Sequence, residues 1–237
     1  MLLLAFETSA KAGSVALMDG DRLLGEFYTN TGLTHSQTLL PMAEALLKNC
    51  GHTPGDVEAV AVAAGPGSFT GVRIGVAAAK GFAWGKELPC YGVSTLEAMA
   101  LQTGLENGII CCAMDARRQQ VYNALFRMEK GELTRLTEDR AISLEELTAE
   151  LQTYNEPIFL VGDGAVLCYE ACQAAVPQLI LPPEHRMHQR AAGVALAALR
   201  AAARGAAADG AALQPNYLRL SQAERERLAK ENHTKEK

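Results

Sequence analysis

The stretch from Gly65 to Gly71 comes closest to a chemical motif in residue type and spacing. It follows an apolar run over residues 57–64 and precedes a helical pattern, which predicts a strand, a glycine turn and a helix. The spacing Gly65-x-Gly67-x-x-x-Gly71 is similar to that of dinucleotide-binding turns. However, three strand patterns precede it, and no acidic residue follows at the required distance. The sequence therefore does not support a dinucleotide site here.

Two other catalytic motifs are missing from the same stretch. A P-loop requires Gly-Lys-Ser/Thr, which does not occur. A serine nucleophile elbow requires glycine two residues either side of the serine, but Pro66 and Thr70 occupy those positions around Ser68. We interpret Ser68 as a turn or N-cap hydroxyl, and the sequence predicts no catalytic residue.

The spacing of cysteine and histidine raises the question of a zinc site. Cys168-x3-Cys172 is followed by His185 and His188, but the intervening residues contain an apolar segment and three prolines, unlike a compact zinc module. We favour buried thiols and predict no metal site. His35 lies at the start of a helical pattern, and we interpret it as a structural or interface residue rather than a base.

Two stripes of small residues follow the glycine turn at helical spacing. Each glycine costs a helix roughly 1 kcal/mol relative to alanine, so we expect close packing. The partner could be the sheet beneath the helix, a second helix or another protein chain. The stripes are Gly71, Gly75 and Ala79 on one side and Ala77, Gly81 and Gly85 on the other.

Length and composition exclude several classes of protein. The chain has 237 residues, 49% of them hydrophobic, so it can bury a large core. A net charge of −5 is unlike that of a stand-alone nucleic-acid binder, which is usually basic. The six cysteines are scattered, as in a reducing cytosol, and no apolar run approaches the length of a membrane span. We expect a cytoplasmic protein without membrane association.

The predicted elements occur in a repeated order. Three strands, with Asp19-Gly20 marking a hairpin turn, precede a helix, a strand and a helix, and the second half begins the same way. This β-β-β-α-β-α repetition predicts an α/β protein with the two-lobed fold of actin-like, sugar-kinase and Hsp70-like ATPases. We expect an N-terminal lobe at 1–104, a C-terminal lobe at 105–188, a helix and extended segment at 189–220 that could return to the first lobe, and a flexible tail at 221–237.

Several segments spread over nearly the whole chain match a known family. The most specific is Gly-Pro-Gly-Ser-Phe-Thr-Gly-Val-Arg-Ile-Gly, at 65–75. The matching segments are Phe6–Ser9, Thr34–Gln37 with Leu40-Pro41, Gly65–Lys80, Asp115–Arg118 with Val121-Tyr122, and Pro215-x-Tyr217-Leu218-Arg219. On these segments the chain resembles the bacterial TsaB family, formerly YeaZ. This family is similar to TsaD, the catalytic subunit that, with TsaB and the ATPase TsaE, places threonylcarbamoyl on the adenosine beside the anticodon (adenosine-37) of tRNA.

The resemblance implies a non-catalytic subunit that binds and activates a TsaD-like catalytic subunit together with a TsaE-like ATPase. It implies contact with tRNA through that complex. TsaD has a His-x-x-x-His metal pair where Thr95 and Met99 stand here, and neither replacement is a good metal ligand. The alternatives within the same fold are a glycoprotease-like peptidase and an ATP-dependent kinase.

Nucleotide and RNA binding stay open at this point. No intrinsic cofactor is expected, but ATP or ADP could bind at the subunit interface. Thr8 and Ser9 are the candidate nucleotide-binding residues, because folds of this type approach phosphates there. Arg73, Arg117 and Arg118 are the candidates for a local basic stripe facing RNA.

The helical patterns at 35–49 and 70–84 are expected to be neighbours that carry the partner surface. If Leu39, Ala43 and Gly71 face inward, apolar and small residues remain on the outer side beside cations, as at many interfaces. The same patch could form a homodimer when TsaD is absent. The predicted interface residues are His35, Met42, Ala45, Val72, Arg73, Val76, Ala77 and Lys80.

Overall fold

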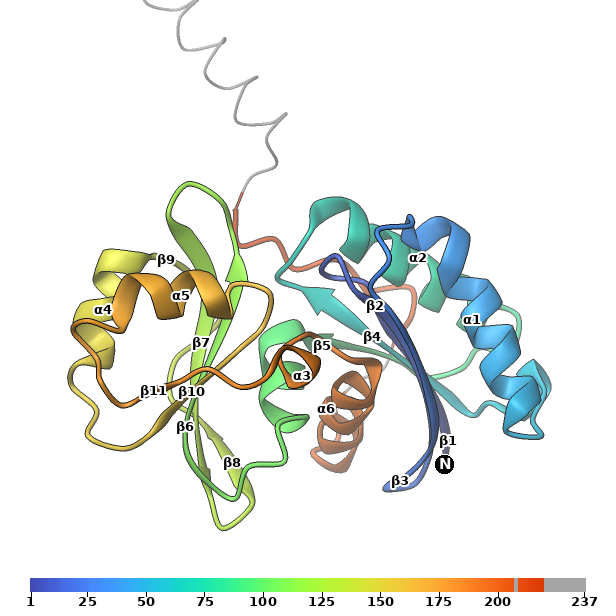
Figure 1. The fold of residues 1–237 in the computed structure, drawn as a ribbon. Helices are drawn as coiled ribbons and strands as arrows, with labels where there is room; N and C mark the ends of the chain where they lie inside the picture. Colours follow the sequence, from blue (N-terminus) through green and yellow to red (C-terminus); the bar gives the residue numbers. More distant parts are fainter. Residues whose placement is uncertain (207–208, 220–237) are drawn as a thin grey trace, which may run out of the picture.

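The computed structural model describes residues 1–206 and 209–219. Its elements stack as helices, sheet, helices, sheet and helices (Figure 1). The predicted tail at 221–237 lies outside the described residues. The boundaries predicted at residues 104 and 188 fall in the connections after helix α3 and before helix α6, and they stay a prediction.

The first sheet has the order β3-β2-β1-β4-β5. Strands β2 and β3 run antiparallel to their neighbours, whereas β4 and β5 run parallel to β1. Gly20, with φ of +60°, forms the predicted turn between β2 and β3. The strands are β1 (Leu2–Glu7), β2 (Gly13–Asp19), β3 (Arg22–Thr29), β4 (Ala59–Gly65) and β5 (Cys90–Ser94).

The second sheet repeats this arrangement with the order β11-β10-β6-β7-β8. Its strands are β6 (Asn107–Asp115), β7 (Gln120–Glu129), β8 (Glu132–Arg135), β10 (Ile158–Val161) and β11 (Leu179–Ile180). The expectation of three strands before the next helix is wrong, because a fourth, β9 (Arg140–Ser143), also pairs with β7. Only four residues long and partly polar, β9 gives no alternating pattern and depends on its long-range partner.

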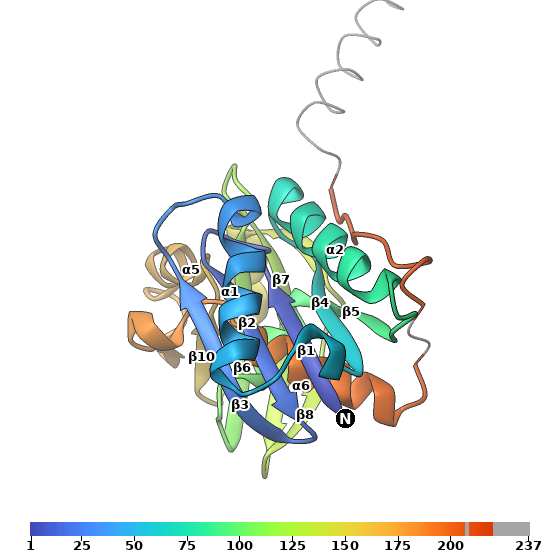
Figure 2. The ribbon, with the colours of Figure 1, turned by 90° about the vertical axis from the view of Figure 1, so that its right-hand side faces the viewer.

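The helices cover both outer faces and fill the space between the sheets. Helices α1 (His35–Asn49) and α2 (Phe69–Trp84) lie side by side on the first sheet (Figure 2). Helices α4 (Leu144–Leu151) and α5 (Ala165–Cys172) cover the second sheet. Between the sheets lie α3 (Thr95–Leu101) and α6 (Ala191–Ala203), and short 3₁₀ turns occur at Pro54–Asp56 and Glu184–Arg186.

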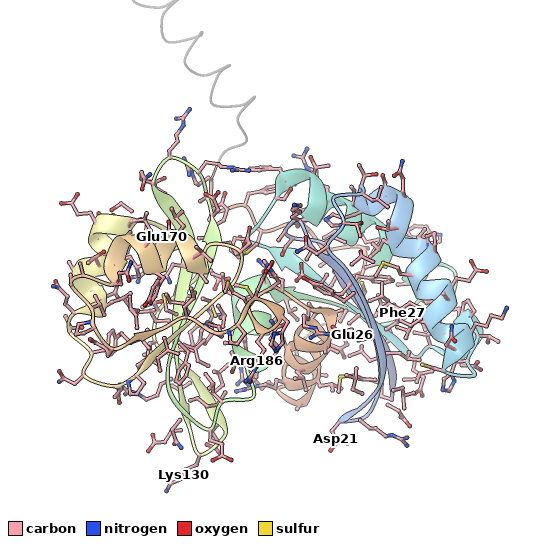
Figure 3. All side chains as sticks on the ribbon, viewed as in Figure 1. Asp21, Glu26, Phe27, Lys130, Glu170 and Arg186 are labelled. Carbon is pink, nitrogen blue, oxygen red and sulfur yellow. The ribbon has the colours of Figure 1, made fainter. Side chains whose placement is uncertain are left out.

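Small residues let α6 fit between the lobes. Its buried alanines pack against the first sheet, and a side chain at Gly193 would clash with the backbone of Ala98 in α3. The helix is also anchored at its first turn, where Ala191 donates its N–H to the Ser14 hydroxyl at 2.7 Å. Arg190 forms an ion pair with Glu26, labelled in Figure 3, at 2.9 Å. The C-terminal helix is therefore part of the core of the first lobe.

Glycines at 71 and 75 bring α2 onto the end of β1. A Cβ at Gly71 would clash with the Thr8 carbonyl oxygen, and one at Gly75 with the Thr8 hydroxyl. That hydroxyl donates to the Gly71 carbonyl at 2.8 Å. The close partner of the first small-residue stripe is thus the sheet beneath the helix. The second stripe faces outward, since nothing lies within 4 Å of a Cβ built at Gly81.

This close approach predicts opposite effects for two alanine substitutions in one helix. Gly71→Ala should lower the free energy of unfolding by about 2 kcal/mol or more, because the new methyl group meets backbone that cannot move aside. Gly81→Ala should raise it by up to about 1 kcal/mol through helix propensity alone. Urea unfolding followed by circular dichroism measures both. Equal effects at the two positions would contradict the packing described.

Candidate functional site

A cleft of about 520 Å³ lies between the lobes. The loop after β1, the glycine turn before α2 and the turn after β6 meet there, at the ends of strands where folds of this class place ligands. The lining residues are Ser9, Ala10, Lys11, Gly67, Ser68, Phe69, Thr70, Met114, Asp115, Ala116, Arg117, Tyr122 and Asp163. The cleft has a cationic entrance and carboxylates within it.

Glu7 lies beneath the floor of the cleft and is 1% exposed. One carboxyl oxygen accepts the Ser9 N–H at 2.6 Å, and the other has no hydrogen-bond partner among the described residues. Burial raises the pKa of Glu7 to about 7, and the nearby charge of Asp163 adds to this effect. Asp163 reaches solvent through the cleft. Desolvation by the surrounding protein raises its pKa, and the hydrogen bond that it accepts from Gln189 at 2.8 Å acts in the opposite direction.

The two candidate nucleotide-binding residues lie in different environments. Both are fully buried, but Thr8 does not line the cleft and its hydroxyl donates to the Gly71 carbonyl, so that hydroxyl is engaged within the fold and nucleotide binding at Thr8 stays a prediction. Ser9 does line the cleft, and its hydroxyl has no partner among the described residues. The Ser9 carbonyl accepts the Ser68 N–H at 2.7 Å, which closes the loop onto the glycine turn.

The residues weighed for metal or base chemistry serve the fold instead. Cys168 and Cys172 are buried in the core of the second lobe, and burial raises the pKa of both thiols. Thr95 and Met99 are also fully buried. The described part of the chain holds no group of three or more His, Cys, Asp or Glu side chains arranged for a metal ion. His35 contacts the Ala10 carbonyl at 2.8 Å and so supports the cleft loop.

The predicted partner surface on α1 and α2 is only partly exposed. Arg73 and Ala77 are exposed, and Met42, Ala45 and Lys80 are half-buried. The expectation that Val72 and Val76 face outward is wrong: they are 2% and 5% exposed. Both belong to the same buried cluster as Leu39 and Ala43 of α1, because α2 is covered by its neighbouring helix as well as by the sheet.

Two large apolar residues on these helices are exposed where the sequence does not predict it. Leu40 of α1 is 53% exposed and Trp84, at the end of α2, is 80% exposed. Helical spacing places Leu40 on the apolar face of α1 with Leu39 and Leu47, so periodicity alone predicts that it faces inward, and the structure contradicts this.

The extended segment 209–219 lies along α2 and reaches the second lobe. Lys80 donates to the carbonyls of Ala211 and Leu213, both at 3.1 Å. The Tyr217 ring stacks on Phe69 with centroids 4.7 Å apart, and Arg73 donates to the Tyr217 hydroxyl at 2.6 Å. Lys80 and Arg73 therefore hold this segment, a role that the sequence did not reveal.

The repeated strand order, the two lobes and the cleft between them define an actin-like ATPase fold. A solved structure described as an uncharacterized protein with similarity to peptidase YeaZ, from Pseudomonas aeruginosa, superimposes with a TM-score of 0.77 at 28% identity. It covers 92% of this chain and 99% of its own. No helix among residues 1–206 and 209–219 is long and apolar enough to cross a membrane.

Sequence comparison specifies the family within this class. The family model described as TsaD, tRNA N6-adenosine threonylcarbamoyltransferase, matches residues 29–227. The tRNA threonylcarbamoyladenosine biosynthesis protein TsaB of Bacillus subtilis is 32% identical over 94% of this chain and 96% of its own length. TsaB of Escherichia coli is 37% identical over 69% of this chain and 72% of its own. The chain belongs to the TsaB family.

The buried Glu7 carboxyl predicts a pH-dependent stability. Its pKa in the folded chain, about 7, is above the ordinary value of 4.5 for a glutamate in an unfolded chain, so folding favours the protonated form. This contribution is fully present below pH 4.5 and is lost as the pH rises through 7. Relative to Glu7→Gln, the wild-type free energy of unfolding should fall across that range by on the order of 3 kcal/mol. Urea titrations at stepped pH test this, and parallel profiles for the two proteins would contradict it.

Proposed function

We propose that this chain is the non-catalytic subunit of a cytoplasmic tRNA threonylcarbamoyladenosine transferase complex. In this role it binds and activates a TsaD-like catalytic subunit and acts together with a TsaE-like ATPase. The proposal is supported by the cleft, which lies where actin-like folds hold ligands, and by Thr95 and Met99, which the family resemblance matches to the two TsaD histidines and which are buried in the core. Neither side chain supplies a strong ligand for a divalent ion.

The outer sides of α1 and α2 are the proposed surface for the TsaD-like subunit. A stable interface takes roughly 800 Å² from each partner, and two neighbouring parallel helices provide a broad face of that kind. Leu40 and Trp84 supply exposed apolar anchors, and Ala77 and Gly81 leave room for the close approach of a partner helix. Met42, Ala45 and Lys80 border this face, and Arg73 adds a cation.

A TsaD-like subunit carries corresponding helices, so two like surfaces can pack as a four-helix contact. The same self-complementary geometry would form a homodimer when that subunit is absent. ATP or ADP at the subunit junction is compatible with Ser9, the predicted nucleotide residue that lines the cleft.

The competing functions are a glycoprotease-like peptidase and an ATP-dependent kinase. Both require turnover by the isolated chain, and we expect none. Assays of the purified protein with peptide substrates and with ATP check this. A rate that survives repurification and is lost on substitution of one residue lining the cleft would favour one of these enzymes instead.

A charge placed on the outer sides of α1 and α2, the helix-pair face, tests the assembly directly. Ala77→Arg adds a bulky cation at an exposed helical position, so it should leave folding unchanged and weaken binding to the TsaD-like subunit at least tenfold. Ala171→Arg makes the same change at an exposed position of α5 and should bind as the wild type does. Calorimetric titration measures both, with thermal unfolding as the check on folding. Wild-type affinity in Ala77→Arg would place the interface elsewhere.

A further inference from the structure

The turn between β6 and β7 has an unusual backbone. Arg117, Arg118 and Gln119 have φ angles of +66°, +58° and +56°, all in the left-handed region. Residues other than glycine adopt it singly, because the Cβ atom crowds the next carbonyl oxygen at roughly 1–2 kcal/mol per residue. Three in succession persist only where neighbouring structure holds them, and such strain concentrates at functional segments.

Hydrogen bonds from both ends hold this turn. Asp115 accepts the Arg117 N–H at 2.7 Å with one carboxylate oxygen and the Arg117 guanidinium at 3.2 Å with the other. Leu144, at the start of α4, donates its N–H to the Gln119 carbonyl at 3.1 Å. The backbone is fixed while the side chains project into solvent, with that of Arg117 86% exposed and Arg118 exposed as well.

Other cations gather around this turn at the entrance of the cleft. Lys11 lines the cleft from the opposite lobe. Arg219 donates to the Ala116 carbonyl in the turn at 2.7 Å. The cationic rim consists of Lys11, Arg117, Arg118 and Arg219.

The rim is a local feature of an acidic protein. The chain has a net charge of −5, yet the described residues that line the cleft contribute only two carboxylates, Asp115 and Asp163. Asp115 is already paired with Arg117. A positive patch on a protein of net negative charge indicates a specific anionic ligand, because the rest of the acidic surface repels anions that bind without specificity.

We propose that the cationic rim binds the phosphate backbone of RNA, and that under the proposed function this RNA is the tRNA to be modified. Arginine suits phosphate because its planar guanidinium donates several N–H groups to the oxygens.

The arrangement favours an extended polyanion over a nucleotide held inside the cleft. Asp115 and Asp163 line the cleft, where carboxylates disfavour the phosphates of a bound nucleotide. Neither Arg118 nor Arg219 lines the cleft. A ligand that contacts both must therefore extend across the entrance.

Charge reversal at the turn tests this inference. We compare the wild type with Arg117→Glu/Arg118→Glu, and with Arg22→Glu/Lys130→Glu as a matched control of equal charge change. Lys130 lies at the end of strands β6 and β7 that is opposite the turn. Arg22 follows Asp21, and Figure 3 shows Asp21 and Lys130 at the same lower edge of the molecule. Arg118→Gln, a single and milder change, covers the case in which the double variant does not fold. The probe is an unmodified tRNA transcript, titrated across a salt series with the chain alone and with the chain mixed with the TsaD-like subunit.

The rim predicts that the turn variant binds tRNA about tenfold more weakly, with a salt dependence that is shallower by about 1.5 in log–log slope, while the control binds as the wild type does. Arg118→Gln should lower the slope by about half as much. Wild-type affinity and slope in the turn variants would overturn the proposal. Loss of ATP binding in the turn variants with unchanged tRNA binding would also overturn it, by making the rim a nucleotide site. Gel filtration with the TsaD-like subunit reports assembly separately, so a failure of the proposed function is distinguishable.

Discussion

The close approach of α2 to the end of β1 is the constraint on which the other features depend. Without side chains at Gly71 and Gly75, the first turns of α2 rest on Thr8, whose hydroxyl is used in that contact. The contact places the glycine turn against Ser9, where the Ser68 N–H closes the cleft loop. It also sets Phe69 at the cleft entrance, against which the segment 209–219 stacks through Tyr217. One packing requirement thus determines the cleft, the helix-pair face and the path of the C-terminal segment.

The same constraint separates the surfaces of the molecule. One side of α2 packs on the first sheet and α1 covers a second side. Only the remaining, outward side of α2 is available to a partner. At the cleft, the Thr8 hydroxyl is used in the contact with α2, and the carboxyl of Glu7 is buried below. The cations Arg117 and Arg118 lie on the turn after β6. This separation supports the proposal that the chain acts through contacts with macromolecules at its surface.

The fold could be predicted because its signals are local and repeated. The Asp19-Gly20 hairpin acts within a short segment, the strand order is repeated in the two halves, and the predicted fold class is confirmed. Strand β9 was missed because it forms only against β7. Val72 and Val76 were misassigned because helical periodicity shows that a residue has a buried side but not that a second helix covers the next one. The contacts of Tyr217 join residues far apart in sequence, and no glycine marks the left-handed backbone of Arg117, Arg118 and Gln119, so neither feature could be derived from spacing.

The central claim is that this chain contributes to tRNA modification by assembling with a catalytic subunit rather than by catalysis of its own. The most direct measurement is threonylcarbamoyladenosine formation on a tRNA transcript, reconstituted from the TsaD-like and TsaE-like proteins of the same organism with and without this chain. We predict product only when the chain is present, at a level that saturates at one chain per TsaD-like subunit. Full product formation without the chain, or product formed by the chain without the TsaD-like subunit, would contradict the claim.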